Sequence, residues 1–246
     1  MMEPFNYSHV IIVGTGGTGS FVLPPLMRYL NTKRPRPTVI LCDGDKYDEG
    51  NINRQEFAHS RIGVNKAQAQ FDVYSQKFPE MEIIPVTEYI GERNVADIIR
   101  EHSVVFCCVD NHVARNVLSR HCQKLNNVLL ISAGNEEFDG NVQSFCRVDG
   151  KNLNEPIEKL HPEIATRNDG DRSEMSCEQL AALPGGGQVI FANNFSATLM
   201  CSVFYTYDNP KPIIGAKKVY EAPDIQEVMF DITQVKTARI IHGEID

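Results

Sequence analysis

Two cations and one carboxylate in the first half of the chain could act together on a phosphate ester. Arg54 and Lys66 supply two fixed positive charges, and Asp110 supplies a hard oxygen of the kind that Mg²⁺ prefers as a ligand. Such a set can bring two anions together and neutralise the charge on a leaving phosphate group. An enzyme that exchanges hydride with NAD has no comparable need for this combination, so the residues favour chemistry at a nucleotide phosphate.

A glycine-rich turn near the N-terminus is the expected seat for that phosphate. The segment HVIIVGTGGTGSF, residues 9–21, reads as an apolar strand, a tight turn and the start of a helix. Glycines allow the backbone to approach a ligand closely, and a helix N-terminus offers free N–H groups to an anion. The glycines of the turn are Gly14, Gly16, Gly17 and Gly19.

An acidic residue, Asp43, follows the second strand at the distance expected for an acceptor of ribose hydroxyls. Together, the turn and this carboxylate fit NAD, FAD and ATP equally well. A glycine turn that holds no ligand is the simpler alternative.

The polar motifs downstream narrow the choice of nucleotide. They are D-x-D at Asp43 and Asp45, N-x-N-R-Q over 51–55, a lysine at Lys66, and CCVDNHVARN around Asp110. With GxGGxG before them, they resemble the ThiF/MoeB/ubiquitin-activating-enzyme family of adenylating enzymes. In detail they resemble the ThiF-family proteins of bacterial PRTRC systems. The resemblance covers residues 9–205.

The resemblance implies a function and a partner. The implied reaction is the ATP- and Mg²⁺-dependent adenylation of a carboxylate, with release of pyrophosphate. The implied substrate is the C-terminal glycine of a small ubiquitin-like protein, and the implied assembly is a homodimer.

The resemblance also implies a role for each motif residue. Asp43 would hold the ribose hydroxyls, Asp45 would lie near the metal and the nucleotide, and Asp110 would ligate Mg²⁺. The residues lining the phosphate site would be Asn51, Arg54, Gln55 and Lys66, with Asn111 as a further nucleotide-binding residue. The simpler interpretation is a capped loop followed by a solvated start of a helix.

The sequence departs from the family in two places. Many relatives bind a structural zinc ion through two CxxC pairs, and no CxxC occurs here, so we expect no such zinc site. In some dimeric relatives an N-terminal arginine reaches the ATP of the other subunit. No arginine precedes Arg28 in this chain, which puts that contribution in doubt.

Cys177 stands where thioester-forming relatives carry their nucleophile. It precedes a helix candidate, whose N-terminus would lower the pKa of a thiol. Arg172 would favour the thiolate, whereas Glu174 and Glu178 would oppose it. The alternative is that Cys177 is a packing residue, which is the role that we expect for Cys42, Cys107, Cys108, Cys146 and Cys201.

The elements that must position these residues alternate between strand and helix, which predicts a Rossmann-like α/β fold. Apolar runs such as HVIIV indicate a mostly parallel sheet with helices on both faces, extended by antiparallel strands toward the C-terminus. We expect an antiparallel or edge strand over 141–148 and a hairpin formed by KKVYEA and EVMFDI. The expected helices cover residues 17–29, 66–77, 113–124 and 189–207.

We expect the chain to divide into an ATP-binding domain, residues 1–208, and a C-terminal β extension, residues 209–246, packed on it. Residues 149–176 are polar and without periodicity, which predicts a mobile loop. A short helix over 177–183 and a PGGG turn over 184–187 would follow. The last helix suits either the core or an interface between subunits.

Composition disfavours several classes of function. A formal net charge of -8 gives no general attraction to nucleic acid. The longest apolar stretch carries Asn193, Asn194, Ser196 and Thr198, so we expect no membrane contact. Seven cysteines without a framework spacing, and no secretory signal, predict a cytoplasmic protein. The scattered histidines His59, His112, His121 and His161 predict no separate site.

Three alternatives stay open at this point. The first is activation of a different carboxylate, such as a modified tRNA nucleoside or a peptide. The second is an NAD-dependent oxidoreductase, and the third is a binding protein that kept the fold and lost turnover.

Overall fold

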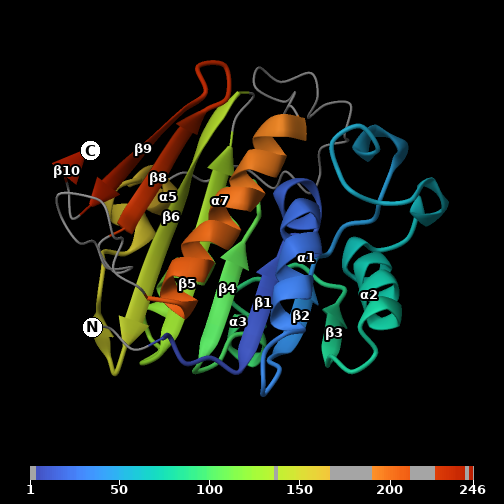
Figure 1. Cartoon of the computed structure of the whole chain (residues 1–246), viewed down its shortest axis with the longest axis horizontal. Coiled ribbons are helices and arrows are strands. Elements are labelled where there is room, and N and C mark those ends of the chain that lie inside the picture. The colour runs from blue at the N-terminus through green and yellow to red at the C-terminus, as the bar shows by residue number, and fades with distance from the viewer. Residues whose placement is uncertain (1–3, 136–137, 167–189, 211–224, 242–243, 246) are drawn as a thin grey trace.

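The computed structural model describes residues 4–135, 138–166, 190–210, 225–241 and 244–245. One mixed sheet of ten strands runs through this part of the molecule (Figure 1). The strand order is β10-β9-β8-β6-β5-β4-β1-β2-β3, and β7 pairs with β6 beside this path. The predicted Rossmann-like fold is therefore confirmed.

The parallel half of the sheet contains the switch point at which ligands bind in such folds. Its strands are β1 (His9–Val13), β2 (Thr38–Cys42), β3 (Ile83–Val86), β4 (Ser103–Cys107) and β5 (Val128–Asn135). From β1 the chain moves outward to β2 and β3, and then returns to pair β4 with the other side of β1. A crevice outside the carboxyl ends of β1 and β4 follows from this order. The glycine turn leaves β1 there, and Asp110 follows β4.

The antiparallel half consists of β6 (Asp139–Val148), β7 (Lys151–Asn152), β8 (Ile225–Asp231), β9 (Lys236–Ile241) and β10 (Glu244–Ile245). The predicted strand over 141–148 lies within β6 and pairs antiparallel with β5 and β8. All of EVMFDI except Ile232 falls in β8, but KKVYEA lies outside the described residues. The described partner of β8 in the hairpin is β9, which the sequence did not predict.

Helices cover both faces of the sheet. On one face lie α1 (Gly17–Leu30), α2 (Lys66–Lys77) and α7 (Ile190–Asp208). In Figure 1, α1 and α7 lie in front of the strands and α2 lies beside β3. On the other lie α3 (Val95–Ile98), α4 (His112–Cys122), α5 (Glu163–Thr166) and the 3₁₀ turn η3 (Ile157–Lys159). Two further turns, η1 (Glu49–Asn51) and η2 (His59–Arg61), lie between β2 and α2. The two apolar cores, one on each face of the sheet, hold the parallel strands in place, and the motifs follow the carboxyl ends of these strands.

Helix α7 buries one side and exposes apolar side chains on the other. Met200, Phe204 and Tyr207 are buried in the core with α1, whereas Phe191 and Tyr205 are 71% and 52% exposed. The core role of this helix is confirmed, and its role in an interface stays a prediction. None of the helices that the structure describes is long and apolar enough to cross a bilayer.

The first part of the predicted loop carries regular structure. Residues 149–166 contain β7, η3 and α5, and Ile157 and Ile164 are buried against α4. Two isolated apolar residues are too few to produce a recognisable periodicity. The rest of that loop, the helix candidate over 177–183 and the PGGG turn lie outside the described residues. Mobility of the loop stays a prediction.

Candidate functional site

The glycine turn packs backbone against backbone. Gly14 has a φ of +85°, a left-handed conformation that favours glycine. A Cβ on Gly19 would lie 1.9 Å from the carbonyl oxygen of Gly14, and a Cβ on Gly14 would lie 2.9 Å from that of Cys108. A side chain at Gly19 would push the start of α1 away from Gly14, and one at Gly14 would push the turn away from the residue that follows β4. The glycines therefore hold the start of α1 close to the switch point, where its free N–H groups can meet an anion.

Asp43 fixes the turn from the side of β2. Its Oδ2 accepts hydrogen bonds from the backbone N–H of Thr15 at 2.7 Å and from the Thr15 hydroxyl at 3.2 Å. Its Oδ1 accepts the N–H of Asp45 at 2.9 Å. Burial raises the pKa of this carboxyl, and the positive charge of Lys66 opposes the shift. A carboxylate has about four acceptor directions, so bonds to ribose hydroxyls remain compatible with these contacts.

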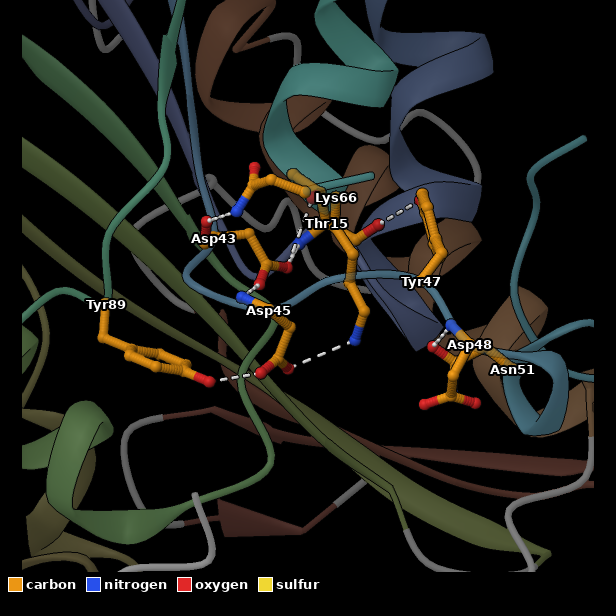
Figure 2. Close-up of polar contacts among 9 residues, drawn as sticks. Thr15, Asp43, Asp45, Tyr47, Asp48, Asn51, Lys66 and Tyr89 are labelled. Atoms are coloured by element: carbon orange, nitrogen blue, oxygen red, sulfur yellow. Dashed lines mark hydrogen bonds and ion pairs between the residues drawn. The ribbon is translucent and has the colours of Figure 1, made fainter. Parts of the chain in front are cut away.

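Asp45 lies between Lys66 and Tyr89 (Figure 2). Lys66 Nζ is 3.2 Å from Asp45 Oδ2, and the Tyr89 hydroxyl donates to Asp45 Oδ1. The Lys66 side chain is 9% exposed, whereas that of Asp45 is 49% exposed. A nearly buried ammonium with a half-exposed partner can exchange that partner for a phosphate arriving from solvent.

A helix cap explains why Lys66 lies there. Asn65 is the N-cap of α2, and its Oδ1 accepts the N–H of Gln68 at 3.1 Å. The same side chain donates from Nδ2 to the carbonyl of Asp43 at 2.9 Å. The N–H of Lys66 donates to the carbonyl of Asp45 at 2.8 Å. The cap thus joins the start of α2 to the end of β2 and brings the lysine to the two aspartates.

The N-x-N-R-Q motif forms a turn against the glycines. Asn51 is 1% exposed, and its Oδ1 accepts the N–H of Asp48 at 3.4 Å in a capping box. The predicted capped loop is therefore real, and a contact of Asn51 with phosphate stays a prediction. Arg54 follows on the same turn with a half-buried side chain.

Gln55 has an unsatisfied buried group beside the turn. It is 6% exposed, and its Oε1 has no hydrogen-bond partner in the part of the chain that the structure describes. A Cβ on Gly16 would lie 3.2 Å from that atom. The terminal amide can be turned to present its N–H donors instead. A buried polar group left open next to a glycine turn fits a site that a phosphate completes.

Asp110 is exposed on the segment after β4, and its neighbours hold that segment in place. Asn111 is the N-cap of α4, and its Oδ1 accepts the N–H of Ala114 at 2.8 Å. Arg115, which the sequence analysis did not single out, is 9% exposed. It donates to the carbonyls of Val109 at 2.9 Å and Ala133 at 2.7 Å. These contacts present Asp110 at the edge of the sheet, and a nucleotide contact of Asn111 stays a prediction.

A buried amide network that the sequence did not reveal joins α7 to the site. The Thr18 hydroxyl donates to Asn135 Oδ1 at 3.3 Å, and Asn135 Nδ2 donates to Asn193 Oδ1 at 2.6 Å. Asn193 Nδ2 donates to the carbonyl of Arg54 at 3.3 Å. The only signal in the sequence was a polar residue inside an apolar run.

The cysteines that the structure describes are packing residues, as expected. Cys42, Cys107 and Cys146 are buried, and Cys108 and Cys201 are half-buried. Burial raises the pKa of Cys42 and of Cys146 to about 12, which keeps both thiols protonated and unreactive. Cys177 lies outside the described residues, so its role stays a prediction.

His161 belongs to a polar cluster away from the glycine turn. Its Nδ1 is 2.9 Å from Glu163 Oε1, and its Nε2 is 2.8 Å from Glu227 Oε1. Asn141 Nδ2 also donates to Glu227 Oε1, at 2.7 Å. The hydrogen bond to Glu227 raises the pKa of His161, and burial opposes the shift. The cluster ties the segment that carries α5 to strand β8.

Similar proteins carry the same kind of domain. The molybdopterin-synthase adenylyltransferase of Escherichia coli is 28% identical over 164 residues, which cover 66% of this chain and 64% of that protein. The ubiquitin-like modifier-activating enzyme 5 of Caenorhabditis elegans is 29% identical over 153 residues, 57% of this chain and 35% of that protein. The tRNA threonylcarbamoyladenosine dehydratase of E. coli is 27% identical over 135 residues, which cover 54% of this chain and 48% of that protein.

Solved structures agree on the fold. E. coli MccB with ATP superposes with a TM-score of 0.68 at 17% identity, and the match covers 98% of this chain and 65% of MccB. This chain therefore matches less than two thirds of the length of the relatives compared. The profile of the ThiF family matches residues 2–206, and the chain belongs to the ThiF family.

Proposed function

We propose that this chain catalyses the ATP- and Mg²⁺-dependent adenylation of a carboxylate. The observation that supports this most strongly is the meeting of the glycine turn, Asp43 and Lys66 at the switch point of the sheet. Asp43 Oδ2 accepts the N–H of Thr15, in the turn, at 2.7 Å. Lys66 Nζ lies 3.2 Å from Oδ2 of Asp45, the second residue after Asp43. An anion-binding turn, a ribose acceptor and a nearly buried cation are the parts that an ATP site needs.

In the proposed reaction, a carboxylate oxygen of the substrate attacks the α-phosphorus of ATP. The bond from that phosphorus to the oxygen bridging to the β-phosphorus breaks, and pyrophosphate leaves with the electron pair. Lys66 and Arg54 stabilise the negative charge that grows on the leaving group. Asp43 holds the turn and accepts the ribose hydroxyls, so that the α-phosphate is oriented toward the incoming carboxylate.

Asp110 fits the role of a Mg²⁺ ligand. It is an exposed carboxylate beyond the carboxyl end of β4, on a segment held by Asn111 and Arg115. No group of three His, Cys, Asp or Glu side chains that could hold a metal occurs among the described residues. Mg²⁺ often takes one carboxylate and completes its shell with phosphates and water, and when bound it neutralises phosphate charge.

For the carboxylate, we infer the C-terminal glycine of a ubiquitin-like protein. Family membership supports this choice, as does the similarity to a ubiquitin-like modifier-activating enzyme. A different carboxylate remains the second candidate, because one relative is named for a modified tRNA nucleoside and MccB has been solved with MccA. An acidic chain with a net charge of -8 favours the protein substrate over the nucleic acid.

The proposal extends to Cys177 as an acceptor of the activated acyl group. Its thiolate would attack the carbonyl carbon of the acyl-adenylate, and AMP would leave. In that case the Cys177→Ala variant still adenylates the substrate protein. It no longer forms the covalent thioester adduct with that protein, which added thiols would cleave in the wild type. An adduct that persists in the variant would remove Cys177 from the reaction.

We also infer a homodimer that works in the cytoplasm. The resemblance of the motifs to dimeric relatives supports the dimer. The exposed apolar side chains of α7, Phe191 at 71% and Tyr205 at 52%, offer a surface that a second copy could cover. Sedimentation of the purified chain measures the state directly.

Exchange of labelled pyrophosphate into ATP tests the function. The wild-type chain is incubated with ATP, Mg²⁺ and small proteins encoded beside it, or with carboxylate-bearing nucleosides and peptides. We expect exchange that depends on one of the protein substrates. Binding of NAD in preference to ATP, measured in the same preparation, would contradict the proposal.

A further inference from the structure

Helix α7 reaches the site through one buried polar side chain. Asn193 is fully buried, and its neighbours on the core face of the helix, Ala192, Ser196 and Ala197, are small. A buried amide costs free energy unless its hydrogen-bonding groups are paired. An amide kept at this position therefore indicates that its hydrogen bonds hold something in place.

The partners of Asn193 belong to three separate parts of the site. Its Nδ2 donates to the carbonyl of Arg54 at 3.3 Å. Its Oδ1 accepts from Asn135 Nδ2, at the end of β5, at 2.6 Å. The same Oδ1 lies 3.5 Å from the hydroxyl of Thr18, in the first turn of α1, whose single hydrogen it shares with Asn135 Oδ1. A Cβ on Gly17 would lie 3.2 Å from Asn193 Nδ2, so the glycine turn packs directly on this amide.

Arg54 needs such a support. It lies in neither a strand nor a regular helix, and the backbone of its turn is bonded through the N–H groups of Arg54 and Gln55 to the carbonyl of Asn51, at 3.1 and 3.0 Å. The hydrogen bond from Asn193 Nδ2 joins the carbonyl of Arg54 to the glycine turn and the sheet. Fixing the main chain at this residue limits where its guanidinium can reach.

We propose that Asn193 is a positioning residue that sets Arg54 relative to the glycine turn, and that it acts on the nucleotide only through Arg54. The inference rests on the proposed function, in which Arg54 stabilises the phosphates of ATP. This role makes α7 part of the site. It also explains the glycine at position 17 without phosphate binding, because a Cβ there would crowd the Asn193 amide.

The test compares Asn193→Ala with Asn194→Ala. Asn194 is the next residue of the same helix and is exposed, so it controls for the loss of an asparagine from α7. We expect the ATP dissociation constant to rise about 10-fold or more for Asn193→Ala, because a small displacement of a positioned group costs up to about 100-fold. For Asn194→Ala we expect less than about a 2-fold change, as is usual for surface substitutions.

A double-mutant cycle with Arg54→Ala separates positioning from a general loss of structure. If Asn193 acts through Arg54, the double variant and the Arg54→Ala single variant should have ATP dissociation constants that differ by less than about 2-fold. A similar rise in both backgrounds would overturn the inference, as would equal ATP binding by the Asn193 and Asn194 variants. Where Asn193→Ala unfolds at the assay temperature, Asn193→Leu, of similar volume, replaces it in the cycle.

Asn135→Ala supplies a further control. It removes a bond to Asn193 Oδ1 but leaves the bond from Asn193 to Arg54, so we expect a lower melting temperature with a smaller effect on ATP binding than Asn193→Ala. An effect on ATP binding as large as that of Asn193→Ala would contradict the role assigned to the Arg54 contact. A wild-type chain that binds no ATP would overturn the proposed function, whereas failure of the cycle alone overturns only the role of Asn193.

Discussion

Lys66 and Asp45 form an ion pair at the carboxyl edge of the sheet, with 3.2 Å between Nζ and Oδ2. Asp45 is held from the other side by the hydroxyl of Tyr89. In the proposed function, Lys66 is the cation that meets the phosphates, and its side chain is only 9% exposed before the nucleotide binds. ATP has only to replace one carboxylate oxygen as the partner of the ammonium.

We first predict that Lys66→Met weakens ATP binding by about 10- to 150-fold, because a hydrogen bond to a charged group contributes about 1.5–3 kcal/mol. Lys77→Met is the matched control, since Lys77 is an exposed lysine at the other end of the same helix. Calorimetric titration of ATP with Mg²⁺ measures both. Equal affinities for the two variants would show that Lys66 does not contact the nucleotide.

Our second prediction concerns the roles of Arg54 and Asp110. Arg54→Ala and Asp110→Ala should each lower pyrophosphate exchange by at least about 100-fold, as loss of electrostatic stabilisation typically does. Their melting temperatures should stay near that of the wild type, because Asp110 is exposed and Arg54 half-buried. Asp97→Ala, which removes an exposed aspartate from α3, should leave exchange unchanged. Full exchange by both site variants would refute these assignments.

The glycine turn gives a third prediction, on stability. In Gly19→Ala the new Cβ would lie 1.9 Å from the carbonyl oxygen of Gly14, so the turn must move. We expect a loss of about 1–3 kcal/mol in the free energy of unfolding, together with loss of ATP binding. Gly91→Ala, where a Cβ meets nothing within 4 Å, should change neither property. Urea unfolding measures the first effect, and an unaltered midpoint for Gly19→Ala would contradict the geometry.

The fourth prediction is a pH dependence from His161. Because Glu227 and Glu163 raise the pKa of this imidazole in the folded chain, its contribution to stability is fully present below the unfolded value of about 6.5. That contribution disappears as the pH rises from there through the raised folded value.

The measurement is the melting temperature against pH for the wild type and for His161→Gln. The wild-type chain should have its largest advantage below about pH 6.5 and should lose it at higher pH. Glu227→Gln should flatten the difference, since it removes the buried carboxylate on Nε2. An advantage of the wild type that grows with pH would have the wrong sign and would exclude the charged bridge.

The parts of the site that depend on local sequence could be predicted. A glycine turn after an apolar strand and a lysine opening a helix need only a few neighbouring residues to specify them, and Gly14 and Lys66 lie where the motifs place them. The order of the motifs also identified the family. Local patterns were sufficient for these features because the strands carry them to one edge of the sheet.

The parts that depend on contacts between distant segments could not be predicted. Asn193 meets Arg54 across 139 positions, and His161 meets Glu227 across 66. Nothing in the composition of either segment indicates its partner. Strand β9 was missed for a similar reason, because KTARII becomes a strand by pairing with β8. The role of Asn51 in a capping box is local, since its partner Asp48 stands only three residues before it.

The products of the reaction test the central claim most directly. Wild-type chain, ATP, Mg²⁺ and the substrate protein are mixed, and the phosphorus-containing products are identified by ³¹P nuclear magnetic resonance and mass spectrometry. Attack at the α-phosphorus predicts pyrophosphate, released in equal amount to an acyl-adenylate or to the AMP that it yields. Formation of ADP and inorganic phosphate instead, or binding of NAD without any turnover of ATP, would contradict the account.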